Sequence, residues 1–262
     1  MGDSWKMQNL EKELEVARAL VRRAGDLTLE YFGKDLDVET KADESPVTVA
    51  DRRTETLICE GLAEAFPDDA ILGEEHGEKP GTSGRRWIVD PIDGTQSFIR
   101  GVPFYGTLLG LEIGDSVPLG VMGFPALDMS LWAVQGGGAW RDGERISVSA
   151  VDRLADATIL TTDAKPAHFG AKAPGFARVL DACGRHRGWG DCYGYALVAM
   201  GQAEAIFDPL LAPWDCAPLV PILSEAGGLF VDWQGRTTIH GASGIGTTPA
   251  LRDEIFALLA DT

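Results

Sequence analysis

Two carboxylates stand three residues apart where an apolar run ends. Residues 87–89 form that run, and Asp90, Pro91 and Asp93 come directly after it. The pattern predicts a buried strand that stops at Asp90 and Pro91. Two acids at the exit of a buried strand repel each other unless a positive charge lies between them. A divalent cation would meet this need, because Mg²⁺ takes oxygen ligands and keeps waters for a phosphate substrate.

The turn that follows these acids suits an anion. Gly94 lets the backbone come close to a ligand, and the amides of residues 94–96 would point at it from the start of a short helix. Thr95 can serve as an ordinary turn or cap residue. Its functional interpretation is a hydroxyl that orients a water molecule bound to the metal. Metal-assisted phosphate chemistry is indicated by the combination of the strand end, the two acids and the anion-binding turn.

Three further acids could belong to the same centre. Glu74 and Glu75 follow a short apolar strand, and such a pair alone is more typical of a solvated turn. Beside Asp90 and Asp93, however, four acids ending two neighbouring strands would need a counter-ion. Asp215 is a good helix cap, and an acid can cap a helix and ligate a metal at once.

Other charged residues and motifs carry less information. Asp51 and Lys41 are by default surface charges, and the four histidines show no ligand spacing. The chain has no G-x-x-x-x-G-K-[ST] motif, which excludes a P-loop. The segment from Asp90 to Thr95 resembles the D-x-D-x-T motif of haloacid-dehalogenase-type phosphatases, but its acids are one residue too far apart.

Composition excludes several classes of partner. The 262 residues carry a formal charge of −17, which argues against nucleic acid or an anionic membrane surface. We find no apolar run of about 18 residues and no signal peptide. The four cysteines show no C-x-x-C spacing, so we expect reduced thiols and a cytoplasmic protein.

The remaining pattern predicts a layered α/β sandwich. Helices are expected over 5–33 and 45–66, a hairpin arm over 36–41, and an antiparallel meander over 104–148. Beyond residue 154 strands and helices alternate. The expected strands there are 158–162, 205–207 and 229–232, and the expected helices are 174–183, 195–200, 215–225 and 249–259. We expect two halves, 1–150 and 151–262, that form one compact unit with the site between them.

Three separated motifs resemble the inositol monophosphatase family over nearly the whole chain. They are Gly73-Glu74-Glu75, Asp90-Pro91-Ile92-Asp93-Gly94-Thr95, and Trp214-Asp215 followed by Glu225-Ala226-Gly227-Gly228. Their order and approximate spacing match the family. The resemblance implies an α-β-α-β-α sandwich, often dimeric, that hydrolyses small phosphomonoesters with two or three Mg²⁺ ions per site.

The resemblance also implies a role for each matching residue. The metal ligands would be the side chains of Glu74, Asp90, Asp93 and Asp215 and the carbonyl of Ile92, with Glu75 beside a weaker outer metal. Asp51 would hydrogen-bond Thr95, and Lys41 would lie on a hairpin that covers the site. Glu74 and Thr95 would orient and deprotonate a water for in-line attack on phosphorus, with Gly94 and Thr95 against the phosphate.

The later part of the chain bears on the substrate. Residues 95–101, 190–195 and 231–233 resemble histidinol-phosphate phosphatases of this family. Histidinol phosphate has an ammonium group and an imidazole, and Asp191 could pair with either. Asp208 could hold the amine, although Asp191 could instead be a cap on the following helix. Inositol-1-phosphate or sugar phosphates are the alternative substrates, and a non-catalytic relative is the alternative class.

Overall fold

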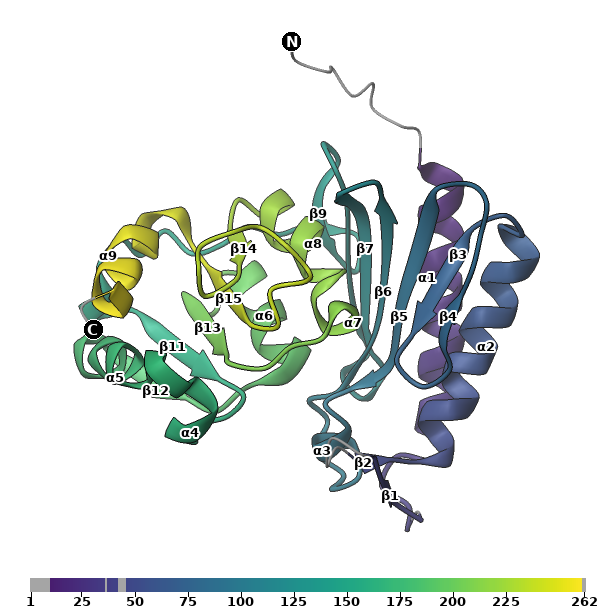
Figure 1. Cartoon of the computed structure of the whole chain (residues 1–262), viewed down its shortest axis with the longest axis horizontal. Coiled ribbons are helices and arrows are strands. Elements are labelled where there is room, and N and C mark those ends of the chain that lie inside the picture. The colour runs from purple at the N-terminus through teal and green to yellow at the C-terminus, as the bar shows by residue number, and fades with distance from the viewer. Residues whose placement is uncertain (1–9, 36, 42–45, 261–262) are drawn as a thin grey trace.

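The elements of this chain stack in five alternating layers of helices and sheets (Figure 1). The computed structural model describes residues 10–35, 37–41 and 46–260. Helices α1 (Glu11–Leu29) and α2 (Val49–Ala65) form the first layer and cover one face of an eight-stranded sheet. The spatial order of that sheet is β10 (Glu144–Arg145), β9 (Gly138–Arg141), β8 (Met129–Val134), β7 (Ser116–Phe124), β6 (Gly106–Ile113), β5 (Arg85–Asp93), β3 (Ala70–Gly73) and β4 (Gly77–Lys79).

The second half of the chain supplies the other three layers. The middle layer contains α6 (Asp191–Ala199), α7 (Pro213–Cys216) and α8 (Leu219–Glu225). A five-stranded sheet follows, in the order β12 (Arg185–Arg187), β11 (Thr158–Thr161), β13 (Ala205–Asp208), β15 (Gly244–Thr247) and β14 (Leu229–Val231). The outer layer contains α4 (Pro166–Phe169), α5 (Ala173–Ala182) and α9 (Pro249–Ala260). The predicted α-β-α-β-α sandwich is therefore confirmed.

Short elements complete the chain. The hairpin of β1 (Glu39–Thr40) and β2 (Pro46–Val47) precedes α2, and α3 (Thr95–Phe98) follows β5. Three 3₁₀ turns lie at Pro125–Leu127, Leu154–Asp156 and Gly170–Lys172. The predicted meander is confirmed by the antiparallel pairing of β6, β7, β8 and β9.

Helix α2 begins later than the sequence pattern predicted. Pro46 pairs with Thr40 in the hairpin, so the expected start near Ser45–Pro46 was wrong. The Thr48 hydroxyl instead accepts a hydrogen bond from the Ala50 amide at 3.1 Å, and Asp51 Oδ2 accepts one from the Thr48 amide at 2.8 Å. This reciprocal cap satisfies the free amides of the first turn and fixes the helix start at Val49.

Strand β5 also differs from its prediction, because it continues through Pro91 to Asp93. Its register against β6 shifts on the way, since Asp90 pairs with Leu108 and Asp93 with Gly106. Three steps along β5 therefore match two along β6, which is a β-bulge. A proline is tolerated at such an irregularity because no ladder hydrogen bond is required of it.

The predicted helix over 215–225 is two helices, α7 and α8, separated at Ala217 and Pro218. Glycines on the eight-stranded sheet let this break come close. A Cβ on Gly110 would lie 2.6 Å from the Ala217 Cβ, and one on Gly120 would lie 2.6 Å from the Pro218 carbonyl oxygen. Larger side chains there would push α7 away from the sheet, so these glycines allow Asp215 to approach β5.

Candidate active site

Three carboxylates from two distant segments converge beside the end of β5. Side-chain oxygens of Asp90 and Asp93 on β5 and of Asp215 on α7 all lie within 4.8 Å of one another. The bulge brings the first two together, because a regular strand would point residues three apart to opposite faces. The centre therefore depends both on the irregular backbone of β5 and on the close docking of α7.

Backbone amides hold each of these carboxylates in place. Asp90 Oδ1 accepts from the amide of Ile92 at 3.0 Å, within the bulge itself. Asp93 Oδ2 accepts from the Cys192 amide at 2.5 Å, and Asp215 Oδ2 accepts from the Ala212 amide at 2.7 Å. Each acid keeps further lone pairs for a cation, since a carboxylate can accept about four hydrogen bonds.

Burial and mutual repulsion dominate the electrostatics of this cluster. Burial, followed by the charge of Asp215, raises the pKa of Asp93 to about 7. Burial also raises the pKa of Asp215 to about 7 and that of Asp90 well above its usual range, with Glu74 contributing to both. A bound divalent cation would reverse these shifts, because it neutralises the negative charge. All three donors are hard oxygens, the ligand type that Mg²⁺ prefers.

Glu74 and Glu75 flank the three aspartates and share one lysine. Lys41 Nζ lies 2.7 Å from Glu74 Oε1 and 2.5 Å from Glu75 Oε1. Burial acts to lower the pKa of Lys41, but its hydrogen bonds to both glutamates outweigh this effect and raise it. Burial raises the pKa of Glu74 to about 7 despite this pairing. Lys41 thus contacts the two acids, on the hairpin side of the site.

Thr95 and Asp51 have partners that differ from the expected ones. The Thr95 hydroxyl donates to the Ile92 carbonyl oxygen at 3.0 Å. Asp51 Oδ2 accepts from the Thr48 hydroxyl at 2.6 Å, while its buried Oδ1 has no hydrogen-bond partner. The expected hydrogen bond between Thr95 and Asp51 is thus not among the contacts of these two described residues. The cap that begins α2 uses Oδ2 of Asp51 and leaves its Oδ1 as a buried acceptor without a donor.

Asp191 begins α6 in a backbone conformation that side-chain-bearing residues rarely adopt. Its φ is +50°, and it is the first residue of α6, whose N-cap residue is Gly190, so Asp191 does not occupy the cap position that the alternative interpretation gave it. Its amide donates to the Thr162 hydroxyl at 2.8 Å. Its Oδ2 lies 3.1 Å from the point where a Cβ on Gly94 would stand. Burial and the charge of Asp93 raise the pKa of Asp191 to about 7.

Asp208 and Asp191 both line a small cavity. The cavity has a volume of about 120 Å³, and its lining includes Asp93, Thr162, Asp191, Tyr195, Asp208 and Asp215. Asp208 is 3% exposed, and neither its Oδ2 nor the neighbouring Tyr195 hydroxyl has a hydrogen-bond partner of ordinary geometry. Burial raises the pKa of Asp208 to about 7. A buried oxygen without a hydrogen-bond partner costs free energy. The cavity therefore offers an acceptor to a hydrogen-bond donor of a ligand.

Several residues of this site escaped sequence reasoning. The amide of Cys192 and the hydroxyl of Thr162 act across long stretches of chain, and no local motif indicates them. Glu55 had a usable signal, since it lies four residues after Asp51 and therefore on the same face of α2. Both side chains are buried.

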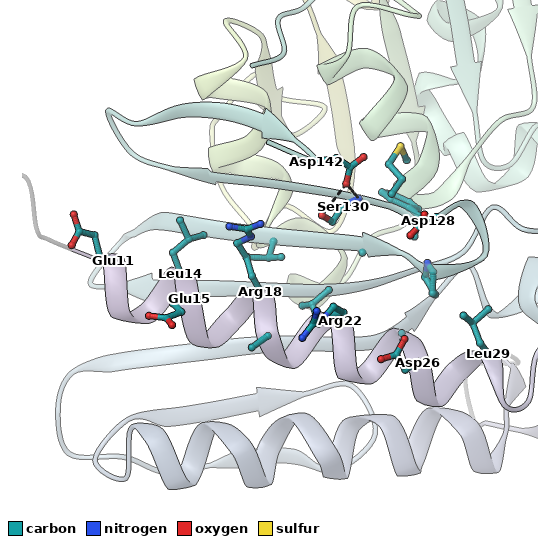
Figure 2. A pocket seen from close by; sticks show the side chains of 18 residues that line it. Glu11, Leu14, Glu15, Arg18, Arg22, Asp26, Leu29, Asp128, Ser130 and Asp142 are labelled. Atoms are coloured by element: carbon teal, nitrogen blue, oxygen red, sulfur yellow. Dashed lines mark hydrogen bonds between the residues drawn. The ribbon is translucent and has the colours of Figure 1, made fainter. Parts of the chain in front are cut away.

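A second and larger hollow lies between α1 and the strands β7 and β8. Its volume is about 540 Å³, and Figure 2 shows Glu15, Arg18, Arg22 and Asp26 along the helix and Asp142 on the far side. Asp142 Oδ1 accepts from the amide of Ser130 at 2.8 Å. Among the described residues, the acids of this hollow do not converge as those of β5 and α7 do. We call it the α1 groove.

Comparison with known proteins identifies the family. None of the helices in the described ranges is long and apolar enough to cross a membrane. The model of the inositol monophosphatase family matches residues 9–261. A histidinol-phosphatase of Chlorobaculum parvum is 45% identical over 89% of this chain and 90% of its own, and one of Mycobacterium tuberculosis is 40% identical over 94% and 97%. The crystal structure of the suppressor protein suhB from Bartonella henselae superposes with a TM-score of 0.89 at 30% identity, covering 95% of this chain and 99% of that one. This chain belongs to the inositol monophosphatase family.

Proposed function

We propose that this chain is a Mg²⁺-dependent phosphomonoesterase that hydrolyses histidinol phosphate to histidinol and phosphate. The names of its relatives support this substrate, since both histidinol-phosphatases match it over nearly their whole length. The cluster of one buried and two half-buried carboxylates supports the metal. The choice between substrates depends on Asp191, because its carboxylate would favour a substrate with an ammonium group over a neutral polyol.

An amine next to the phosphate would need an acid beside it, and Asp191 is our candidate for this role. In histidinol phosphate the ammonium-bearing carbon is adjacent to the carbon that bears the phosphoester oxygen. A carboxylate that recognises the amine must therefore lie close to the phosphate site. Asp191 Oδ2 approaches Gly94 of the predicted phosphate turn. Without an ammonium between them, a carboxylate there would repel a phosphate, so a neutral inositol ring is a poorer fit.

The proposed metal site uses residues from three segments. Its ligands are Glu74, Asp90, Asp93, Asp215, the Ile92 carbonyl and, more weakly, Glu75. Bound Mg²⁺ would lower the pKa of water and neutralise charge on the transferring phosphoryl group, worth several kcal/mol of barrier. We propose two or three such ions per site.

The protein's own groups would bind and orient the substrate and the water. Glu74 lies close enough to the aspartates that its charge adds to burial in raising the pKa of Asp90 and of Asp215, so it could receive the proton of a water held at this centre. The Thr95 hydroxyl donates to Ile92 and keeps its lone pairs free to accept a hydrogen bond from water. Gly94 has φ +79° and no side chain, so the turn can approach a phosphate closely. Asp191 and Asp208 would hold the ammonium group across the cavity between them.

The decisive experiment measures phosphate release from histidinol phosphate and from inositol-1-phosphate, each with Mg²⁺ and with EDTA. We expect a preference of about 100-fold or more for histidinol phosphate, which equals about 2.7 kcal/mol at the transition state. Asp191→Asn should remove most of that preference, because it removes the charge that pairs with the amine. Equal losses on both substrates would contradict the assignment of Asp191.

Asp128 provides a matched control for this variant. It has a φ of +49°, close to that of Asp191, but it lies in the α1 groove. Asn tolerates this backbone conformation as Asp does. Asp128→Asn should therefore leave the substrate preference unchanged, and a similar change in both variants would indicate a general effect on the fold.

We also propose a homodimer, a cytoplasmic location and a division of the chain near residue 150. Four unpaired cysteines support a reducing compartment. The strands of the first sheet end at Arg145, and those of the second begin at Thr158, which supports halves of 1–150 and 151–262. Light scattering coupled to size-exclusion chromatography would measure the mass in solution, and a monomeric mass would contradict the dimer.

A further inference from the structure

One fully buried carboxylate lies beneath the turn that carries Glu74 and Glu75. Glu55 on α2 is 0% exposed. Its Oε2 accepts from the Glu75 amide at 2.8 Å, and its Oε1 accepts from the His76 amide at 2.8 Å. The same Oε1 lies 2.8 Å from Nδ1 of the His76 ring. A single side chain from another element thus satisfies two backbone amides of the β3–β4 turn.

The sheet is shaped to admit this carboxylate. A Cβ on Gly73, the last residue of β3, would lie 2.1 Å from Glu55 Oε1. Because Gly73 does not have a positive φ, its lack of a side chain is required by the close approach rather than by backbone conformation. The glycine before Glu74 therefore makes room for the group that holds the turn.

The turn is held from two sides. On the inner side Glu55 binds the amides of residues 75 and 76, and on the outer side Lys41 bridges the carboxylates of Glu74 and Glu75. Burying a carboxylate costs free energy, and the cost rises when other acids lie nearby. Stability of the fold alone therefore does not account for an acid at position 55. Two charge-assisted hydrogen bonds to backbone do, however, fix the turn closely.

We propose that Glu55 is a positioning residue that sets the metal-binding geometry of Glu74 and Glu75. The inference rests on the proposed metal site. Glu55 contacts neither substrate nor cation and acts only through the backbone of the turn. Groups that orient metal ligands from behind typically contribute about 10- to 100-fold in metal affinity or activity when they are removed.

The chain offers a matched control in Glu225. Its carboxylate also accepts from two backbone amides of a turn, those of Gly136 at 2.8 Å and Gly138 at 2.7 Å. That turn connects β8 to β9 and carries none of the proposed metal ligands. Glu225→Gln therefore removes the same kind of tie without touching the Glu74 turn.

The test is calorimetric titration of Mg²⁺ into the metal-free wild type, Glu55→Gln and Glu225→Gln, with the melting temperature of each metal-free protein. We expect Glu55→Gln to weaken Mg²⁺ binding by about 10-fold or more. We expect the Mg²⁺ affinity of Glu225→Gln to stay within about twofold of the wild-type affinity. Its melting temperature should fall by about as much as that of Glu55→Gln. Equal weakening in both variants, or none in Glu55→Gln, would overturn the inference. Failure of the wild type itself to bind Mg²⁺ would instead overturn the proposed function.

Gly73→Ala tests the same inference without changing Glu55. The added Cβ should displace the carboxylate and weaken Mg²⁺ binding as Glu55→Gln does. Both changes act on the contact between the Glu55 carboxylate and the turn. The Mg²⁺ affinity of the double variant should therefore be no lower than that of whichever single variant has the lower affinity. Additive losses would show two separate effects and would overturn the inference. The titration of the single Gly73→Ala variant also stands if Glu55→Gln does not fold.

Discussion

The two hollows of this molecule differ in size and in the state of their charges. The cavity beside Asp191 and Asp208 has a volume of about 120 Å³, whereas the α1 groove has about 540 Å³. In the small cavity the acids are largely buried, and burial raises the pKa of several to about 7. In the groove Arg22 and Asp26 are exposed to solvent on one helix face (Figure 2).

This difference teaches that the removal of charges from water, more than volume, distinguishes the proposed active site from the α1 groove. A buried carboxylate repels its neighbours strongly and gains much from a cation or an ammonium group. An exposed carboxylate is already solvated and gains little from a new partner. The smaller hollow therefore concentrates the electrostatic energy that metal and substrate could use.

The largest effect should follow from neutralising one half-buried acid of the cluster. Asp93→Asn removes a proposed metal ligand while its side-chain oxygen can still accept from the Cys192 amide. We expect phosphate release to fall by about a thousandfold, because a lost ligand withdraws several kcal/mol of charge stabilisation. The metal-free variant should melt at a higher temperature than wild type, since one source of repulsion is gone. Activity assays and thermal melts measure the two opposite changes.

Asp26→Asn makes the same chemical change in the α1 groove. If it also abolished phosphate release, the contrast between the two hollows would be wrong. Loss of activity in Asp93→Asn together with a lower melting temperature would instead indicate that this acid stabilises the fold.

A medium effect should appear as a pH dependence of the metal-free protein. Burial raises the folded pKa of Asp93 and Asp215 to about 7, from a usual value of 3.8. Between these values the folded chain binds more protons than the unfolded chain, so the free energy of unfolding falls as pH rises and levels off above about 7. Thermal melts in EDTA at pH 5, 6, 7 and 8 should therefore show a declining melting temperature.

Mg²⁺ provides the control for this dependence. With the cation bound, the acids stay ionised in the folded protein, so saturating Mg²⁺ should stabilise most at pH 8 and least at pH 5. The same slope with Mg²⁺ and with EDTA would mean that the decline comes from the overall charge of −17 and not from this cluster.

The smallest effect is expected in the groove. Arg22→Ala and Asp26→Asn alter exposed side chains on α1 and should leave phosphate release within about twofold of wild type. Their effect on the free energy of unfolding should stay within about 0.5 kcal/mol. Denaturant titration would measure the second quantity. A loss beyond these limits would give the groove a role that its solvated charges do not indicate.

Sequence reasoning predicted the layers because their patterns are local. Turn residues separate strands β6 and β7, which are close together in the chain, and the helices have clear apolar faces. A shared cation for Asp90 and Asp93 was expected from the strand end itself, whereas Asp215 was assigned to the same centre through the resemblance to a family. No spacing rule connects residue 93 with residue 215.

The errors arise where distant contacts decide the local structure. The hairpin partner of Pro46 delays the start of α2, and the hydrogen bonds of Asp51 and Thr95 go to Thr48 and to the Ile92 carbonyl instead of to each other. The roles of Thr162 and Glu55 depend on backbone amides that other segments bring to them. Such contacts follow from the assembled fold, so a single sequence without its partners does not indicate them.

The bulge in β5 has a consequence for how this centre can change over time. The bulge makes three steps along β5 match two along β6, so Asp90 and Asp93 face the same layer. Inserting one further residue between them in regular ladder register would send one carboxylate into the opposite layer, because side chains along a strand alternate between its faces. Deleting one residue would instead remove the bulge and leave the two acids two steps apart on one face of a regular strand. Evolution can therefore exchange or remove a residue between the two acids more freely than it can add one.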